Sequence, residues 1–260
     1  MSSGAPTLKS AAQIEAMARA GAILGRLFEV IAPRIGPGVT TADLDAFGEE
    51  FIRSHPGAEP AFKGLYGFPG SLCISVNEEV VHGIPTPKRS LAEGDTVTID
   101  GGVKLDGWYV DAARTFPVGE IDAGVKRLLD VTREALEAGI GQAWPGRRMG
   151  DIGAAIQAVA EGAGFGVVRD LVGHGLGRSP HEEPQVPNYG RPGKGMVLRE
   201  GLVLAIEPMV NAGTPEVRTL EDRWTVVTAD GGRSAHFEQT VAITASGPRV
   251  LTGADVAVRS

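Results

Sequence analysis

Two stretches of the chain echo each other: residues 93–100 read EGDTVTID, and residues 200–207 read EGLVLAIE. Both begin with Glu-Gly and end in a carboxylate, Asp100 in the first and Glu207 in the second. A second acid follows in each half of the chain, Asp111 after Tyr-Val and Glu238 after His-Phe. Burying a carboxylate on such apolar, strand-like segments is costly unless a partner compensates its charge. The echo therefore indicates an internal duplication with a pseudo-two-fold axis, whose four acids could enclose a pair of cations.

The composition is that of an ordinary globular protein. Of the 260 residues, 42% are hydrophobic and 22% are charged, which is enough for one large domain or two small ones. The net charge of -7 argues against a protein that coats nucleic acid. We find no apolar run long enough to span a bilayer, and the first ten residues lack the apolar region of a secretory signal. The single cysteine, Cys73, cannot form an internal disulfide, which fits a reducing cytoplasm.

The order of the periodic segments favours an α+β fold. Helical spacing of apolar residues covers 11–32, and a Thr40-x-x-Asp43 capping signal precedes a second helix near 41–54. Residues 97–118 predict a hairpin with its tip at 105–107, after a loop at 58–70. The remaining predicted elements are helices at 122–140 and 149–163 and strands at 71–76, 77–85, 166–172, 202–210, 224–228 and 236–244. Two helices followed by strands thus occur twice, which favours α+β over a doubly wound parallel sheet.

The acids form the first candidate site. A single aspartate on a strand is usually solvated, but isoleucine precedes Asp100 and an almost wholly apolar run precedes Glu207. Carboxylates in such places need a cation or raised pKa values. Their oxygens suit divalent ions such as Mn, Fe, Co or Zn, and bridging carboxylates suit sites with two metals. The set consists of Asp100, Asp111, Glu207 and Glu238.

Two histidines lie in the segment GHGLGRSPHEEP, residues 173–184. His174 stands between two glycines, which let backbone and ligand approach closely, and His181 follows seven residues later. Alone, His174 could equally be a loop residue with a backbone hydrogen bond. Beside four acids, a metal ligand is the favoured interpretation.

Two further histidines have open roles. His82, in NEEVVHGIP at 77–85, could shuttle protons or hold a substrate amide, or it could be a core histidine with satisfied hydrogen bonds. His236 lies two residues before Glu238 and shares its strand face. With this spacing, His236 could either support the site from beside Glu238 or be an ordinary surface residue.

These segments together resemble the type I methionine aminopeptidases of the short bacterial form. The resemblance runs from about residue 9 to residue 247, through SLCISVNEEVVHGIP, TIDGGVKLDGWYVDAARTF, GHGLGRSPHEEPQVPN, LAIEPMV and TVVTADGGRSAHFEQTVAIT. It implies the α+β pita-bread fold, in which two pseudo-two-fold related halves surround a curved antiparallel sheet. It also implies a flexible N-terminus at 1–9 and a single catalytic domain at 10–250, with halves of roughly 10–120 and 121–250.

The resemblance implies removal of the initiator methionine from nascent proteins when the second residue is small. Two divalent ions (Co, Mn, Fe or Zn) would activate a hydroxide that attacks the scissile carbonyl. Asp100 would chelate one ion, and His174 and Glu207 would complete the other. Asp111 and Glu238 would bridge the two.

Three side chains would act on the substrate by the same resemblance. His82 and His181 would contact the scissile amide and the tetrahedral intermediate without binding metal. Glu207 would also accept a proton.

The methionine side chain would bind in an apolar pocket. By resemblance, its walls would be Phe62, Leu65, Phe68, Cys73 and Trp224. The chain departs from the common pattern at Leu65 and Phe68, which replace tyrosines. It also has Tyr66 where a histidine is frequent, and Pro180 where a bulky residue often precedes the second motif histidine. We expect the pocket to remain apolar, and the resemblance does not fix its shape or the reaction rate.

Two other functions are compatible with this fold. An X-Pro aminopeptidase or prolidase has the same catalytic fold but usually carries a large extra N-terminal domain, whereas residues 1–95 here fit the methionine aminopeptidase pattern. A metal-free binding module on this fold would have lost ligands, and none is lost. The resemblance implies nascent peptide N-termini as partners, transient ribosome association, no nucleic-acid specificity, no membrane, a monomer and a cytoplasmic location.

Overall fold

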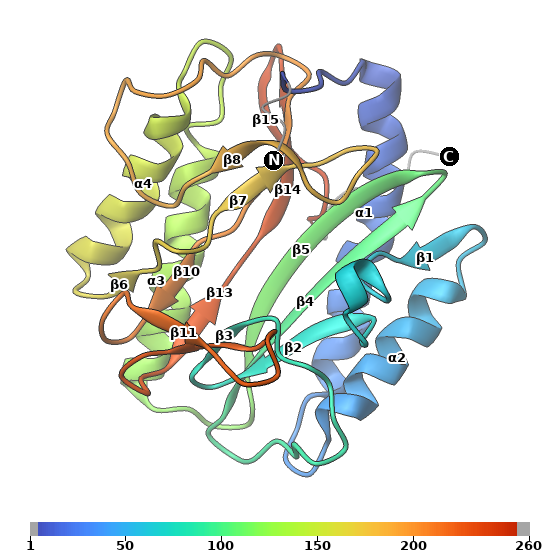
Figure 1. The fold of residues 1–260 in the computed structure, drawn as a ribbon, viewed down its shortest axis with the longest axis vertical. Helices are drawn as coiled ribbons and strands as arrows, with labels where there is room; N and C mark the ends of the chain where they lie inside the picture. The colour runs from blue at the N-terminus through green and yellow to red at the C-terminus, as the bar shows by residue number, and fades with distance from the viewer. Residues whose placement is uncertain (1–4, 254–260) are drawn as a thin grey trace.

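The first half of the chain consists of two helices followed by a strand-rich segment (Figure 1). The computed structural model describes residues 5–253. The elements of this half are α1 (Ala11–Ile31), the 3-10 helix η1 (Ala32–Arg34), α2 (Thr41–Arg53), β1 (Ala58–Pro60), the 3-10 turn η2 (Leu65–Gly67), β2 (Leu72–Val76), β3 (Glu79–Val81), β4 (Thr96–Leu105) and β5 (Trp108–Pro117). The predicted helices and hairpin are confirmed. The capping signal is confirmed too, since Thr40 Oγ1 accepts the Asp43 N–H and Asp43 accepts the Thr40 N–H.

The second half repeats two helices and then strands. Its elements are α3 (Ala123–Ile140), α4 (Met149–Gly162), β6 (Gly166–Val167), β7 (Gly173–Gly175), β8 (Glu182–Val186), β9 (Val203–Ile206), β10 (Met209–Asn211), β11 (Val217–Thr219), β12 (Val226–Thr228), β13 (Ser234–His236), β14 (Gln239–Thr244) and β15 (Gly247–Val250). The predicted strand at 166–172 was too long, because only 166–167 pair. Strands β1, β7, β8, β11 and β15 were not predicted, and all but β11 contain glycine or proline, which disfavour strands locally. Pairing with neighbouring strands stabilises them instead.

Every strand pairing among the described residues is antiparallel. In the first half, β4 is the central strand and pairs with β1, β2 and β5, and the largest sheet of the second half has the order β15-β14-β9-β7-β8. Two smaller sheets have the orders β13-β10-β6 and β11-β12-β3, so β3 of the first half pairs with β12 of the second. The expected curved sheet is thus divided by its main-chain hydrogen bonds into four.

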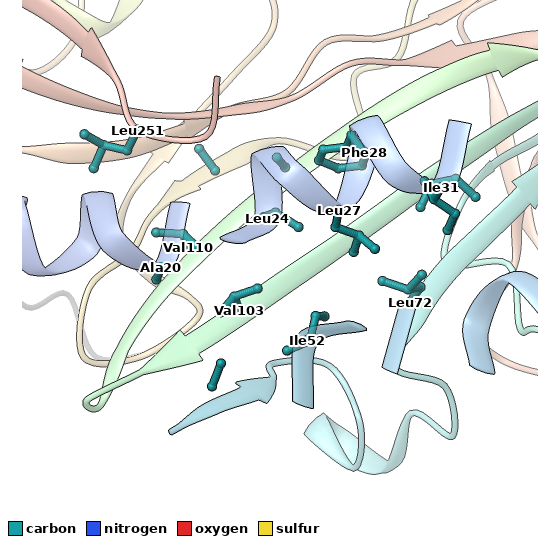
Figure 2. Packing of buried hydrophobic residues seen from close by; sticks show 14 of the residues in the cluster. Ala20, Leu24, Leu27, Phe28, Ile31, Ile52, Leu72, Val103, Val110 and Leu251 are labelled. Atoms are coloured by element: carbon teal, nitrogen blue, oxygen red, sulfur yellow. The ribbon is translucent and has the colours of Figure 1, made fainter. Parts of the chain in front are cut away.

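Helix α1 covers one face of the β4–β5 hairpin. Leu24, Leu27 and Phe28 are fully buried and pack toward Val103 of β4 and Val110 of β5 (Figure 2). Each such side chain contributes about 1.5–3 kcal/mol on burial. Because strand side chains alternate between faces, the residues adjacent to Val103 and Val110 face away from this core. No helix in the described part of the chain is long and apolar enough to cross a bilayer.

Two buried hydroxyls join the halves, and we call Thr115 and Thr240 the threonine seam. Thr240 Oγ1 accepts the Asp111 N–H at 2.9 Å and donates to the Asp111 carbonyl at 2.7 Å. Thr115 Oγ1 accepts the His236 N–H at 2.9 Å and donates to the His236 carbonyl at 2.8 Å. Side chains therefore satisfy backbone groups that no main-chain ladder reaches, and they hold β5 beside β13 and β14 (Figure 1).

The expected flexible segment 1–9 is packed at its end. Lys9 is buried, with Nζ 2.8 Å from Glu182 Oε2, and its N–H donates to the Gly201 carbonyl at 2.7 Å. Residue 9 therefore belongs to the packed structure, and residues 1–4 lie outside the described ones.

Replacing Thr240 by valine keeps the shape of the side chain and removes its hydroxyl. Thr240 is completely buried, so the N–H and C=O of Asp111 would lose their partner. We expect the free energy of unfolding, measured by urea denaturation, to fall by about 2–4 kcal/mol, since each unsatisfied buried group costs about 1–3 kcal/mol. The same change at exposed Thr219 of β11 should stay within about 0.5 kcal/mol. Equal effects of the two changes would contradict the seam.

Candidate metal centre

One cavity of about 240 Å³ collects the residues singled out in the sequence. Its polar wall comprises Asp100, Asp111, Glu207, Glu238, His82, His174 and His181. Its apolar wall comprises Phe62, Leu65, Phe68, Cys73 and Trp224, with Tyr66 beside them. Segments from both halves of the chain meet here. We call the four carboxylates the acid cage.

The acids of the first half lie inside the hairpin, not at strand ends. In the β4–β5 register Asp100 is opposite Ala113, and Gly102 is opposite Asp111. Directly opposed residues share a face, so the two acids are diagonal neighbours on one face. Side chains of β4 and β5 alternate between the face that packs against α1 and the opposite face. Asp100 and Asp111 lie on the opposite face, so both carboxyl groups point toward the second half.

The acids of the second half lie where strands end. Glu207 follows β9 and Glu238 precedes β14, one position beyond the pair Ile206–Gln239. Continuing this register makes the two glutamates directly opposed. The Glu238 N–H donates to the Ala113 carbonyl at 2.9 Å, which attaches it to β5. The sequence echo thus produces a diagonal pair of acids in one half and an opposed pair in the other.

Within residues 5–253, the acid cage has no positive side chain beside it; three of its acids are buried and the Glu207 side chain is 13% exposed. Burial, reinforced by the charges of the neighbouring acids, raises the pKa of Asp100, Glu207 and Glu238 well above the ordinary range. Burial raises the pKa of Asp111 to about 7. Among the described residues, no lysine or arginine forms an ion pair with these acids, and Asp100 Oδ1, Asp111 Oδ1 and Glu238 Oε1 lack hydrogen-bond partners. Buried carboxylates in this state are suited to bind divalent cations.

His174 presents one ring nitrogen to the cage. Its Nδ1 lies 2.9 Å from the Gly175 carbonyl, so the Nδ1–H donates there. The Nε2 atom is then free as an electron-pair donor, 3.5 Å from Glu207 Oε1. Burial lowers the pKa of His174 to about 4, which keeps the ring neutral. This tautomer and orientation are those of a metal-binding imidazole.

The glycines beside His174 serve its neighbouring strands. A Cβ atom on Gly173 would lie 2.3 Å from the Ala205 carbonyl oxygen, and one on Gly175 would lie 2.3 Å from that of Glu183. The expected close approach of backbone at these glycines is confirmed: they allow β7 to fit between β8 and β9, which fixes the position of the ring.

Two groups of three residues can each hold an ion. The first group is Asp111, His174 and Glu238. The second group is Glu207, His236 and Glu238, so the two groups share Glu238. Within each group, one ligand atom per residue lies within 4.8 Å of the others. Carboxylate and imidazole donors fit Mn, Fe, Co or Zn. His236 is 1% exposed, so the prediction that it could be a surface residue was wrong.

The histidines of the cavity flank the cage. The His181 ring lies 4.5 Å from that of His174, and its Nδ1 is 3.5 Å from the Tyr66 hydroxyl. His82 lies 6.4 Å from the Trp224 ring, with a left-handed backbone at φ 60°. Burial lowers the pKa of His82 and His181. Both rings are therefore neutral at pH 7 and able to donate or accept a hydrogen bond. Tyr66, noted in the sequence only as a departure, is part of the site.

Comparisons with known proteins agree along almost the whole chain. Residues 15–245 match metallopeptidase family M24. The methionine aminopeptidase of Clostridium perfringens is 54% identical over 245 residues, 94% of this chain and 98% of the relative. The crystal structure of methionine aminopeptidase from Thermotoga maritima matches with a TM-score of 0.94 at 46% identity, covering 96% of this chain and all of that one. Prolidase from Pyrococcus furiosus, at 24% identity and a TM-score of 0.76, shares the fold over 94% of this chain and 65% of its own.

Metal binding should release protons from the acid cage. Below its pKa of about 7, Asp111 retains a proton that an ion must displace, so affinity falls as pH falls. His174, with a pKa of about 4, contributes no proton above pH 5.5. We expect the apparent affinity for Mn²⁺ to rise about tenfold per pH unit for each proton displaced. Titration calorimetry between pH 5.5 and 8, in buffers of different ionisation enthalpy, measures both quantities.

The exposed carboxylate Asp106, at the hairpin tip, supplies the control for this titration. Asp106→Asn should leave the proton release unchanged. Affinity that is independent of pH would contradict protonated acids in the metal-free site.

Proposed function

The chain belongs to metallopeptidase family M24, and we propose that it removes the N-terminal methionine of nascent proteins by metal-dependent hydrolysis. A relative more than half identical over nearly the whole length supports this substrate. The observation that carries the proposal is that one cavity is lined on one side by the acid cage and on another by an apolar, aromatic surface. The first suits metal-assisted hydrolysis, and the second suits an unbranched apolar side chain.

We propose that the centre holds two divalent ions, with Co, Mn, Fe and Zn as candidates. Asp100 would hold one ion, and His174 and Glu207 would hold the other. Asp111 and Glu238 would bridge the two. The charge of four buried carboxylates supports this number, because a single dication would leave two negative charges uncompensated. When bound, such ions supply a Lewis acid for the scissile carbonyl and lower the pKa of a water molecule.

Three residues of the chain would act directly on the substrate. His181, beside His174 at the cage, can donate a hydrogen bond to the oxygen that gains charge on the scissile carbonyl. His82, on the Trp224 side of the cavity, can hold the nitrogen of the scissile amide. Glu207 lines the same cavity, and a carboxylate placed there can accept a proton as a general base.

The apolar wall would select methionine. The Phe68 and Trp224 rings pack edge to face at 5.1 Å and form a cluster with Phe62 and Cys73. Burial raises the pKa of the Cys73 thiol well above its usual value, so it stays neutral and behaves as a small apolar group. Leu65, partly buried against this cluster, keeps the wall apolar at a position where tyrosine is common in the family.

The prolidase alternative has less support. The solved prolidase shares only the fold at 24% identity, and about a third of its chain lies outside the match. We propose that this protein acts in the cytoplasm as a monomer with transient ribosome contact, in keeping with a nascent-chain substrate.

Asp111→Asn and Glu238→Gln should each abolish most turnover, because a proposed bridging carboxylate loses its charge. We expect kcat/KM for methionine release from Met-Ala-Ser to fall by at least about 100-fold, above the usual effect of removing a group that only supports a ligand. Asp106→Asn is again the matched control. Activity near that of the wild type in either cage variant would contradict the bridging role, and cleavage of Ala-Pro-Ala alone would contradict the substrate.

His181→Ala should lower kcat without removing metal. The imidazole is proposed to donate only to charge that develops during the reaction, so the loss should be about 100- to 1,000-fold in kcat. Metal content measured by mass spectrometry should equal that of the wild type. A large loss of metal would make His181 a ligand instead.

A further inference from the structure

His236 has no role in the function proposed above, although it is among the most buried polar side chains. It ends β13 and is 1% exposed, and it is not among the residues that line the cavity. Neither Nδ1 nor Nε2 has a hydrogen-bond partner among the described residues. A buried imidazole without partners is costly, and such a group calls for an explanation.

The ring faces the far side of the acid cage. Its Nε2 lies 3.8 Å from Glu207 Oε2 and 4.0 Å from Glu238 Oε2. His174 lies on the other side of the same glutamate, with Nε2 3.5 Å from Oε1. The Glu207 carboxylate is therefore situated between two imidazoles, one for each oxygen.

These distances exclude a present hydrogen bond and permit two roles. At 3.8 and 4.0 Å the atoms are too far apart for direct donation. An ion between them would make His236 a ligand, and a small shift of the carboxylates would make it a hydrogen-bond donor. The five proposed ligands all line the cavity, whereas His236 does not. A ring outside the cavity lining and 3.8 Å from a cage oxygen has the position expected of a group that supports ligands.

The backbone of His236 is held in place by the first half of the chain. Both its N–H and its carbonyl are bonded to Thr115 of the threonine seam, and Thr115 Oγ1 is also 2.8 Å from Thr98 Oγ1. The strand pairs with β10 through Met209. The position of the ring is thus fixed from two directions, and the glutamates are the groups that can adjust.

We propose that His236 is a positioning residue of the metal centre: its Nε2–H holds Glu207 Oε2, beside Glu238 Oε2, and so fixes the orientation in which Glu207 would bind metal. The neutral ring has one proton, so this tautomer leaves only an acceptor lone pair unpaired at Nδ1. The inference rests on the proposed metal centre but not on the peptide substrate.

The test compares two replacements of His236. His236→Gln retains an N–H donor, and His236→Leu removes it. We expect the leucine variant to lose about 10- to 100-fold in affinity for Mn²⁺ by titration calorimetry, and the glutamine variant to stay within a few-fold of the wild type. The melting temperature of the metal-free leucine variant should not fall, because it loses an unpartnered polar group, while its rise on adding Mn²⁺ should be smaller.

Proton NMR of the Co²⁺-loaded protein separates positioning from ligation. An imidazole bound to Co²⁺ gives a strongly shifted, exchangeable N–H signal. We expect one such signal, from His174, which persists in His236→Leu and disappears in His174→Ala. A second signal that disappears in His236→Leu would overturn the proposal, because His236 would then be a ligand.

Three other results would also overturn it. These are unchanged Mn²⁺ affinity in the leucine variant, a glutamine variant as weak as the leucine one, and a metal-free leucine variant that melts lower. In each of them wild-type metal binding is intact, so the proposed function stands. A wild-type protein that binds no Mn²⁺ would contradict both.

Discussion

The burial of four carboxylates close to one another is the constraint on which the arrangement of this molecule depends. Burial raises the pKa of all four acids, the charges of neighbouring acids raise that of Asp100, Glu207 and Glu238 further, and three oxygens have no partner among the described residues. Packing elsewhere must therefore hold the acids together in the metal-free protein. The core under α1 fixes the β4–β5 hairpin, and the threonine seam fixes that hairpin against β13 and β14. The cost of assembling the acids is met by the scaffold, which makes the centre ready to bind cations.

The two halves share a scaffold but supply different chemistry. Each contributes two helices and two acids, yet Asp100 and Asp111 are diagonal within a continuous hairpin, whereas Glu207 and Glu238 lie opposed where strands end. Both imidazoles near the cage carboxylates, His174 and His236, come from the second half. One half thus provides a rigid acidic surface, and the other provides the neutral donors.

Much of the fold and site could be predicted because the relevant signals are local. Long amphipathic helices with caps and a hairpin with a Leu-Asp-Gly tip have strong short-range patterns, and acids in apolar runs mark the cage. The strands β7 and β8 gave no such signal, because their order depends on pairing partners distant in sequence. The glycines around His174 indicated a close approach, but spacing alone cannot show that the backbone of β8 and β9 is what lies nearby. Nor could alternation reveal that His236 faces Glu207, since that contact is set by the threonine seam.

The central claim is that the acid cage is a two-metal centre serving methionine removal. Metal analysis of the protein purified without oxygen, with methionine release from a Met-Ala peptide measured on the same sample, tests it most directly. We predict two divalent ions per chain at saturation, with activity that is lost on chelation and restored by metal. Full activity in the chelated protein, or fewer than two bound divalent ions per chain at saturating metal, would contradict the account.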